Sequence, residues 1–317
     1  MCFIIQIIQS LFVQKKIMQQ QYNVQNDQLL VWVGNQLYPR AEAKVSVFDS
    51  SVQGGDAVWE GLRVYNGHIF ALDEHLNRLQ ESAKAMLFEG VPSLEFIKNA
   101  IFETLKANQM RDQTHIRLTL TRGEKITSGM DPRLNQKGCT LIVLAEWKQP
   151  VYGSTGVRLI TASVRRNSPM NLDSKIHHNN LINNILAKIA ANIANADDAL
   201  MLDNYGFVSE TNACNIFMVK NGTLYTPHAD ACLPGITRKK VLAIAQQIGL
   251  PFAEKNISLT EIYNANEVFT TGTMGELTKV WEIDGRKIEN PNNTSTLQLI
   301  QQHFTQLTQT EGEELPF

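Results

Sequence analysis

The sequence lacks most of the features that reveal a protein's function at first sight. Its 29 Lys and Arg residues are balanced by 31 Asp and Glu residues, so the net charge is −2 over 317 residues. This balance excludes the broad positive field that nucleic acids and anionic membranes attract. There is no Walker P-loop, GxGxxG, HExxH or GxSxG motif, so the common nucleotide-binding and hydrolase functions lose support. Any anion must therefore be bound by a few individually placed groups.

Cysteine is also scarce. The four cysteines are far apart, at Cys2, Cys139, Cys214 and Cys232. They form no CxxC pair and no Cys/His spacing of a zinc site, so we expect neither a metal site nor a disulfide framework. We therefore expect reduced cysteines and a cytoplasmic protein. No apolar run reaches the ~20 residues that a membrane-spanning helix requires.

The rest of the pattern predicts two α+β domains. We expect a smaller domain over 22–147 and a larger one over 156–317, joined by a linker over 148–155 that contains Pro, Gly and Ser. Residues 1–21 form an apolar start followed by two lysines, which is the wrong order for a secretory signal. We expect an unassigned extension there, with a targeting segment as the alternative.

Local patterns predict the individual elements. In the first part we expect hairpins at 29–38 and 59–72, helices at 72–86 and 94–108, and strands at 114–121 and 140–145. Asp73 and Ser93 are the expected caps of the two helices. In the second part we expect strands at 157–163, 199–202, 215–219, 223–226 and 267–271, helices at 181–193 and 237–248, and a hairpin within 281–288. Antiparallel hairpins mixed with helices favour α+β units over a doubly wound parallel sheet.

Two isolated charged residues suggest chemistry. Lys175 stands just before the long helix, and a lysine kept partly neutral by burial can form a Schiff base with a carbonyl compound. The alternative is a solvated surface cation. Glu210 stands between two strand-like segments, where it could exchange a proton with a heterocycle nitrogen; the alternative is a turn carboxylate that bonds nearby backbone N–H groups.

The helix start at Leu233–Lys240 is a candidate anion site, because free N–H groups and the positive end of the macrodipole meet there. Its three cations, Arg238, Lys239 and Lys240, oppose that dipole unless a bound phosphate compensates, the alternative being full solvation. The loop Thr271-Gly272-Thr273 offers further donors. Arg63 could supply a two-pronged contact to phosphate oxygens.

Five motifs occur together in one order. They are Trp59-Glu60-Gly61-Leu62-Arg63, Lys175 before its Asn-rich helix, Val208-Ser209-Glu210 with Asn215-Ile216-Phe217, Leu233-Pro234-Gly235-Ile236-Thr237-Arg238, and Thr271-Gly272-Thr273. Together they resemble the fold-type IV (class IV) aminotransferases that use pyridoxal 5′-phosphate, most closely the branched-chain group, from Val45 to Ile288. The resemblance implies the two-domain fold of D-amino acid aminotransferase, with mixed and antiparallel sheets and flanking helices.

The resemblance also implies roles for single residues. Lys175 is similar to the lysine that binds the cofactor covalently and moves the substrate proton, and Glu210 to the carboxylate that keeps the pyridine nitrogen protonated. The implied phosphate contacts are Arg63, Ile236, Thr237 and Thr273, and Leu233 is the apolar residue on the ring.

The substrate residues depart from the branched-chain pattern. Asn180 stands where a tyrosine is common, and His115 replaces the tyrosine of a Tyr-x-Arg segment whose arginine, Arg117, is a candidate partner for the substrate carboxylate. His177 and His178 lie between Lys175 and Asn180. We do not expect them to form a metal pair, since adjacent side chains diverge and no third ligand is apparent; they either help bind substrate or are ordinary polar residues.

The resemblance implies transamination between an amino acid, with a branched-chain L-amino acid favoured, and a 2-oxo acid such as 2-oxoglutarate. It also implies a homodimer, while the charge balance gives no nucleic-acid or membrane partner. The alternatives are pyruvate elimination of the aminodeoxychorismate lyase kind, and a D-amino acid or (R)-amine aminotransferase on the same scaffold. A binding protein without turnover, or an unrelated α+β protein, is the alternative from a different class.

Overall fold

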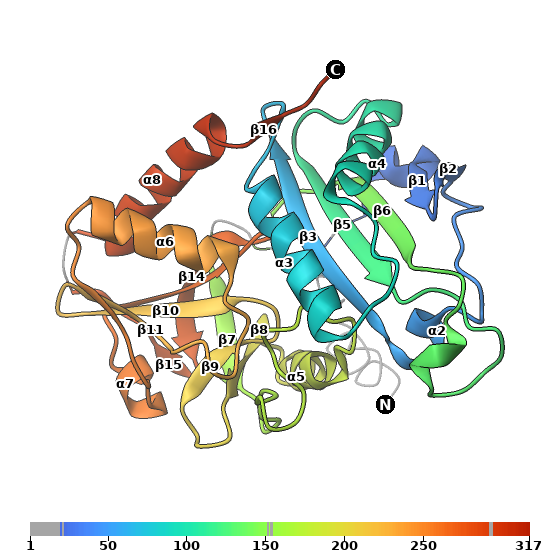
Figure 1. Cartoon of the computed structure of the whole chain (residues 1–317). Helices are drawn as coiled ribbons and strands as arrows, with labels where there is room; N and C mark the ends of the chain where they lie inside the picture. The colour runs from blue at the N-terminus through green and yellow to red at the C-terminus, as the bar shows by residue number, and fades with distance from the viewer. Residues whose placement is uncertain (1–19, 21, 151, 153–154, 292–293) are drawn as a thin grey trace, which may run out of the picture.

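The computed structural model describes residues 20, 22–150, 152, 155–291 and 294–317. The extension expected at 1–21 therefore lies outside the described residues except for Gln20, and the linker expected at 148–155 lies partly outside them. Two sheets with their own helices stand next to each other (Figure 1), which confirms the α+β fold class. The exact domain boundaries stay a prediction.

The first sheet is antiparallel throughout and has the order β16-β4-β3-β5-β6-β1-β2. Its strands are β1 (Leu30–Val33), β2 (Gln36–Pro39), β3 (Ala57–Tyr65), β4 (His68–Ile69), β5 (Thr114–Thr121), β6 (Thr140–Trp147) and β16 (Glu313–Glu314). The helices of this part are the 3-10 helices η1 (Val24–Gln28) and η2 (Pro132–Leu134), the short α2 (Ser50–Gly54), and α3 (Leu72–Ala85) and α4 (Leu94–Ala107). Figure 1 shows α3 and α4 lying over one face of this sheet.

The second sheet is mixed and has the order β12-β11-β10-β13-β14-β7-β8-β9, with β15 paired to β14. Its strands are β7 (Val157–Thr161), β8 (Asp198–Leu202), β9 (Val208–Thr211), β10 (Asn215–Lys220), β11 (Thr223–Thr226), β12 (Phe252–Glu254), β13 (Glu267–Gly272), β14 (Glu276–Ile283) and β15 (Arg286–Lys287). Its helices are α5 (Ile182–Ile193), α6 (Ile236–Gln247), α7 (Leu259–Tyr263) and α8 (Thr296–Thr310). No helix among the described residues is long and apolar enough to cross a membrane.

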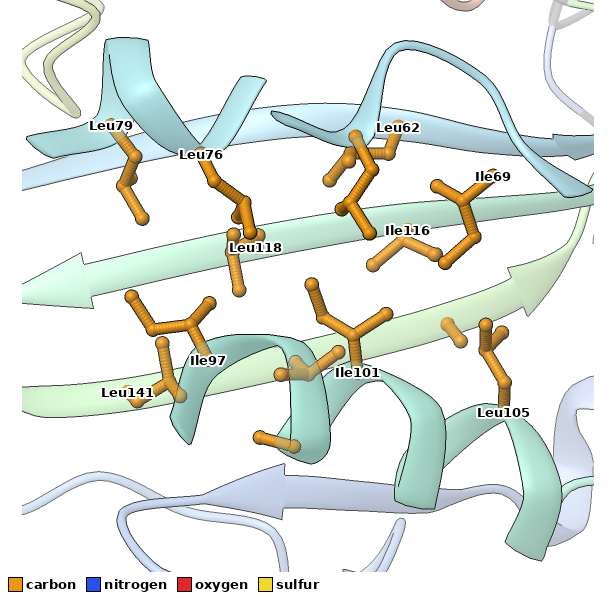
Figure 2. Close-up of a cluster of buried hydrophobic side chains, with 14 of the residues drawn as sticks. Leu62, Ile69, Leu76, Leu79, Ile97, Ile101, Leu105, Ile116, Leu118 and Leu141 are labelled. Carbon is orange, nitrogen blue, oxygen red and sulfur yellow. The ribbon is translucent and has the colours of Figure 1, made fainter. Parts of the chain in front are cut away.

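The core of the first part is built from leucine and isoleucine. Figure 2 shows Leu76 and Leu79 of α3 and Ile97 and Ile101 of α4 directed at the sheet, where Leu118 of β5 lies between them. All five side chains are fully buried. This packing fixes α3 on β3, and α3 in turn carries residues that reach the functional site described below.

The start of α3 differs from the expectation. The capping position is Ala71, in the left-handed conformation with φ of 53°, and no side chain caps the helix. Asp73 lies inside the first turn, because α3 already begins at Leu72, two residues after the connection from β4 starts at Phe70. The cap expected at Ser93 is confirmed, since its side chain accepts a hydrogen bond from Phe96 N.

Helix α5 presents its apolar side chains outward. Its buried residues are Asn184, Ala187 and Ala191. Its large apolar residues, Ile182, Ile185, Leu186, Ile189 and Ile193, are between 47% and 77% exposed. The small residues thus pack on the sheet, and the apolar stripe that gave the helix its sequence period has no cover among the described residues.

We predict that Leu76→Ala lowers the free energy of unfolding by about 2–5 kcal/mol, because it opens a cavity in a fully packed core. Urea unfolding followed by circular dichroism measures this loss. The control is Leu299→Ala on the exposed side of α8, for which we expect a change within about 0.5 kcal/mol. An equal effect of both variants would contradict the packing described for α3.

Candidate active site

Two adjoining cavities lie where the two sheets meet. The first has a volume of about 260 Å³ and the second about 430 Å³. Their linings share Trp59, His177, Lys188, Glu210, Asn212, Ala213 and Leu233. Strand β3 of the first sheet and β9 of the second therefore face one continuous space. A larger cavity of about 520 Å³ near β14 and α8 is lined by none of the residues predicted for the site.

Most of the predicted site residues meet in this space. Glu210 and Leu233 line both cavities. The first cavity is also lined by His115, Ile236, Thr237 and Thr273, and the second by Arg117. These residues come from four separate segments of the chain, so the fold has brought distant motifs to one place.

Lys175 is not brought there, and the expectation that it faces the cavity is corrected. The residue is exposed and belongs to neither lining. The cause is a turn in which Ile176 N donates to Asp173 O at 3.1 Å, while Lys175 N donates to the Asp173 carboxylate at 2.9 Å. This Asx-type turn is typical of aspartate, and it directs Lys175 to solvent. Asn180 is likewise exposed and lines neither cavity.

Glu210 is held rigidly in the floor of the site. Arg166 Nε donates to its Oε1 at 2.6 Å, and Asn215 Nδ2 donates to its Oε2 at 3.2 Å and to Leu233 O at 2.8 Å. Burial raises the pKa of Glu210, and the Arg166 guanidinium opposes that shift. Gly235 completes the arrangement, because a Cβ atom there would lie 2.1 Å from Asn215 Oδ1. The sequence analysis did not identify Arg166. The signal that could have done so is the pair Arg165-Arg166, which lies between β7 and α5.

The start of α6 opens on the first cavity. Its capping residue Gly235 offers no side chain, and Ile236 and Thr237 line the cavity. The N–H groups of this first turn have no partner within the helix. Thr271 also lines the cavity, and its buried Oγ1 has no hydrogen-bond partner among the described residues. The end of the first cavity at α6 therefore offers several donors.

The cations of this helix point elsewhere. Arg238 pairs with Glu254 at 2.5 Å, and Glu74 pairs with Lys239 at 2.9 Å and with Lys240 at 2.8 Å. Carboxylates of the chain itself thus offset the three charges. Neither a bound phosphate nor full solvation is needed to balance these charges at the start of the helix. The three cations therefore give no argument for a bound anion.

Arg63 belongs to neither cavity lining. It is 4% exposed, and its Nη2 donates weakly to Lys148 O at 3.4 Å. Its Nε and Nη1 are buried without a partner in the described part of the chain. Unpaired buried donors of a charged group are costly. Arg63 shares its strand face with Trp59 and Gly61, which do line the first cavity.

His177, two residues after Lys175, is the residue of this segment that lines both cavities. Its ring packs on Trp59 with a centroid separation of 4.0 Å and lines both cavities. The backbone of its segment extends the first sheet beside β3, since Trp59 N donates to His177 O at 2.9 Å and Asn179 N to Ala57 O at 2.8 Å. From the sequence alone, His177 could be either a substrate-binding residue or an ordinary polar residue.

His177 is anchored by Glu60, which is fully buried under α3. Arg78 donates to Glu60 through Nε at 2.8 Å and Nη2 at 2.7 Å, and the Nδ1 atoms of His75 and His177 lie 2.7 Å and 3.1 Å from its oxygens. Burial alone would raise the pKa of Glu60, but His177, Arg78 and His75 together hold it well below its usual range. Glu60 is therefore ionised and accepts each of these bonds.

Two other side chains complete the polar lining. Arg117 lies over the Trp59 ring at 3.3 Å and donates to Asn179 Oδ1 at 2.9 Å. Burial lowers its pKa to about 10, which leaves it charged at neutral pH. His115 is buried beside Gly61, and burial together with the charges of Lys148, Arg63 and Arg117 lowers its pKa to about 3. The described residues include no cluster of three or more His, Cys, Asp or Glu able to hold a metal ion.

We predict that acid destabilises the protein well above the pKa of its carboxylates. Burial lowers the pKa of His177 to about 4 and that of His115 to about 3, below the value of ~6.5 in an unfolded chain. Between pH ~6.5 and ~4 the unfolded state therefore binds more protons, and stability falls as pH falls. At pH ~5 each histidine costs about 2 kcal/mol relative to pH ~7.5.

Urea unfolding measured from pH 7.5 to pH 5 tests this. His115→Gln should remove about half of the pH dependence that these two histidines cause. A variant whose unfolding free energy depends on pH as steeply as the wild type would show that His115 is not neutral and buried in the folded state.

Comparison with known proteins agrees with this geometry. The model of the family described as amino-transferase class IV matches residues 57–283. Branched-chain-amino-acid aminotransferase-like protein 1 of Arabidopsis thaliana is 59% identical over 293 residues, which are 92% of this chain and 53% of that protein. The chain thus spans about half the length of this relative.

Two further relatives match over nearly their whole length. Branched-chain-amino-acid aminotransferase of Pseudomonas aeruginosa is 33% identical over 271 residues, covering 82% of this chain and 86% of that protein. The solved T.th. branched-chain amino acid aminotransferase with pyridoxamine 5′-phosphate superposes with a TM-score of 0.82 at 32% identity, over 89% of this chain and 94% of that one. The family match, the relatives and the meeting of the motifs in one cavity lead to one conclusion: the chain belongs to the class IV aminotransferases.

Proposed function

We propose that this chain binds pyridoxal 5′-phosphate in the first cavity and transfers an amino group between an amino acid and a 2-oxo acid such as 2-oxoglutarate. The observation that carries the proposal is the convergence of Glu210, Leu233 and the start of α6 on one cavity between the sheets. The relatives are named as branched-chain aminotransferases. For a chain that spans half of its Arabidopsis relative, the activity is a proposal.

The phosphate end of the cofactor fits the donors near α6. The N–H groups of Ile236 and Thr237 suit an anion by both hydrogen bonding and the helix dipole. Thr271 Oγ1 and the unpaired nitrogens of Arg63 are buried donors that an anion would satisfy. Thr273 lines the same cavity. These residues would hold the phosphate.

The ring end fits the floor of the cavity. Glu210 would hold a proton on the pyridine nitrogen, with Arg166 and Asn215 fixing its carboxylate, and Leu233 would pack on the ring. When bound, the cofactor supplies an electron sink for the substrate carbon. Among the residues that the structure describes, Lys175 does not fit a role at the aldehyde, because it lies outside the cavity.

The second cavity suits an amino acid with an apolar side chain. Its lining includes Ile176, Leu181, Ile185 and Ile189 alongside Arg117. We infer that the apolar residues contact the substrate side chain and that Arg117 binds its carboxylate, which favours branched-chain L-amino acids. Nothing in these contacts favours the pyruvate-eliminating lyase or the D-amino acid and (R)-amine alternatives. The cytoplasmic location stays a prediction.

We further infer that the protein is a homodimer. The exposed apolar stripe of α5 is continuous with the second cavity, because Ile185 and Ile189 belong to both. Contiguous apolar surface of this kind is typical of protein interfaces. A second copy of the chain would cover the stripe and close the cavity from solvent.

We predict that the protein loaded with pyridoxal 5′-phosphate converts L-leucine to its 2-oxo acid, and that Glu210→Ala lowers this rate by about 10²-fold or more, because the ring nitrogen loses its charged partner. Chromatographic detection of the oxo acid, compared across L-leucine, L-glutamate, D-alanine and an (R)-amine, makes the measurement.

Glu42→Gln, an exposed carboxylate outside both cavities, is the control. A Glu210→Ala variant with the wild-type rate would argue against the proposed function. Pyruvate release with no amine form of the cofactor would instead assign the lyase.

We predict that Ile189→Glu shifts the protein from dimer to monomer at micromolar concentration, because it places a charge in the centre of the apolar stripe. Sedimentation velocity reports the change. Ile126→Glu, at a residue that is 55% exposed and far from α5 in sequence, should leave the dimer intact. A wild-type protein that sediments as a monomer would contradict the inferred homodimer.

A further inference from the structure

The two cavities contain one lysine, and its amine is already engaged. Lys188 is the only lysine in the described linings. Its Nζ donates to Asp197 O at the far end of α5. Lys175 is held in its turn outside both linings. The part of the chain that the structure describes therefore places no unengaged lysine amine in these cavities to attack a carbonyl group of a ligand.

A histidine is presented instead, in the geometry of a general base. The His177 ring lines both cavities and is bound at Nδ1 to the ionised Glu60. Its Nε2 has no hydrogen-bond partner among the described residues and is not among the buried unpartnered atoms. A carboxylate at Nδ1 keeps the proton on that nitrogen, which leaves the Nε2 lone pair free to accept another. The same division of roles operates wherever a carboxylate orients a catalytic imidazole.

The surroundings keep this histidine neutral. Glu60 from β3, Arg78 from α3 and Arg117 from β5 act on its charge. His75 shares its contact with Glu60, and Lys188 and Glu210 line the same two cavities. Burial, with the two arginines, lowers the pKa of His177 to about 4, although Glu60 opposes the shift. At neutral pH the ring is therefore able to accept a proton.

We propose that His177, and no lysine, carries the proton in this site, and that an aldehyde of the pyridoxal phosphate class is held here without a covalent bond to the chain. The proposal rests on the proposed function. Nε2 accepts the proton from the substrate carbon that bears the amino group. The substrate amine would first condense with the aldehyde and release one water; the C–H bond would then break, an N–H bond would form at Nε2, and the electron pair would be taken up by the electron sink that the cofactor supplies when bound. The same proton would then leave Nε2 for the former aldehyde carbon, and one water would hydrolyse the C=N bond to release the 2-oxo acid, so that His177 ends neutral as it began.

Glu60 is the positioning residue of this arrangement. It does not line either cavity, and it acts through His177 by fixing the ring's tautomer and orientation. Its bidentate pairing with Arg78 and its contact with His75 keep it in place under α3. Sequence reasoning from motifs sees the Trp-Glu-Gly-Leu-Arg segment but cannot see which residue the glutamate holds.

Borohydride trapping tests the covalent part of the proposal without relying on activity. Equimolar pyridoxal 5′-phosphate is added to the full chain, unbound cofactor is removed, and borohydride is applied before denaturation and peptide mass spectrometry. We expect the reduced cofactor to be released as the free alcohol, with Lys175 and Lys188 unmodified. An adduct at either lysine would overturn the proposal while leaving the proposed function intact, whereas absence of any cofactor binding would overturn both.

Introducing an amine at the proposed position gives the converse result. His177→Lys should capture the cofactor, with the trapped mass located on residue 177. His228→Lys, at an exposed histidine outside both cavities, is the matched control and should show no adduct. A His177→Lys variant that binds the cofactor but is not modified at residue 177 would show that this side chain does not face the aldehyde.

The proton-transfer part is tested by His177→Gln. We expect kcat to fall by about 10²–10⁴-fold, the Kd for pyridoxal 5′-phosphate to stay unchanged, and deuterium exchange from solvent into the substrate carbon to be lost. Glu60→Gln should keep the exchange measurable but change its pH profile, because the ring's tautomer is no longer fixed. Undiminished exchange in His177→Gln would overturn the role given to Nε2.

Discussion

The buried carboxylate of Glu60 is the interaction on which the site depends. A charge with no exposure must be fully paired, since an unpaired buried charge costs several kcal/mol. Glu60 meets this requirement with two nitrogens of Arg78, one of His75 and one of His177. Strand β3, helix α3 and the segment before α5 are thereby fixed to one another. A single side chain thus determines where the wall of the cavity lies relative to the first sheet.

The side of the cavity that belongs to the second sheet is held in the same way, by a second buried carboxylate with its own partners. Glu210 is buried on β9 and is paired with Arg166, while Asn215 links it to the backbone of Leu233 at the entrance to α6. Each sheet therefore contributes one anchored carboxylate, and the cavity lies between them. Glu210 would contact the ligand directly, whereas Glu60 acts through the His177 imidazole that it orients. Such prior fixation reduces the cost of ordering polar groups when a ligand binds.

The sequence allowed the fold to be predicted where the signals are local. The Asn66-Gly67 turn, the alternation of 114–121 and the Ser93 cap all produce the expected elements. The family motifs led to Glu210, Leu233 and the start of α6, because the position of each of these residues is set by a short segment of sequence.

The position of Lys175 could not be predicted in this way. Its residue type and the helix that follows it pointed to the site, but the turn at Asp173 determines where the lysine lies. The partners of Arg238, Lys239 and Lys240 come from Glu254 and Glu74, distant in sequence, and no local pattern indicates such pairs. Helix α8 escaped notice because its many Gln and Thr residues dilute the apolar period of Leu297, Ile300 and Phe304.

The pairing of β16 with β4 has a consequence for how the chain is made. A protein is synthesised from its N-terminus, and early segments begin to fold before later ones emerge. Residues 313–314 are nevertheless the outer strand of the first sheet, and Lys98 of α4 binds Glu313 at 2.7 Å. The edge at β4 must remain unpaired until nearly all of the described chain has left the ribosome, and open edges invite pairing with other chains. Completion of the first sheet therefore waits for residues 313–314, although most of that sheet is made first.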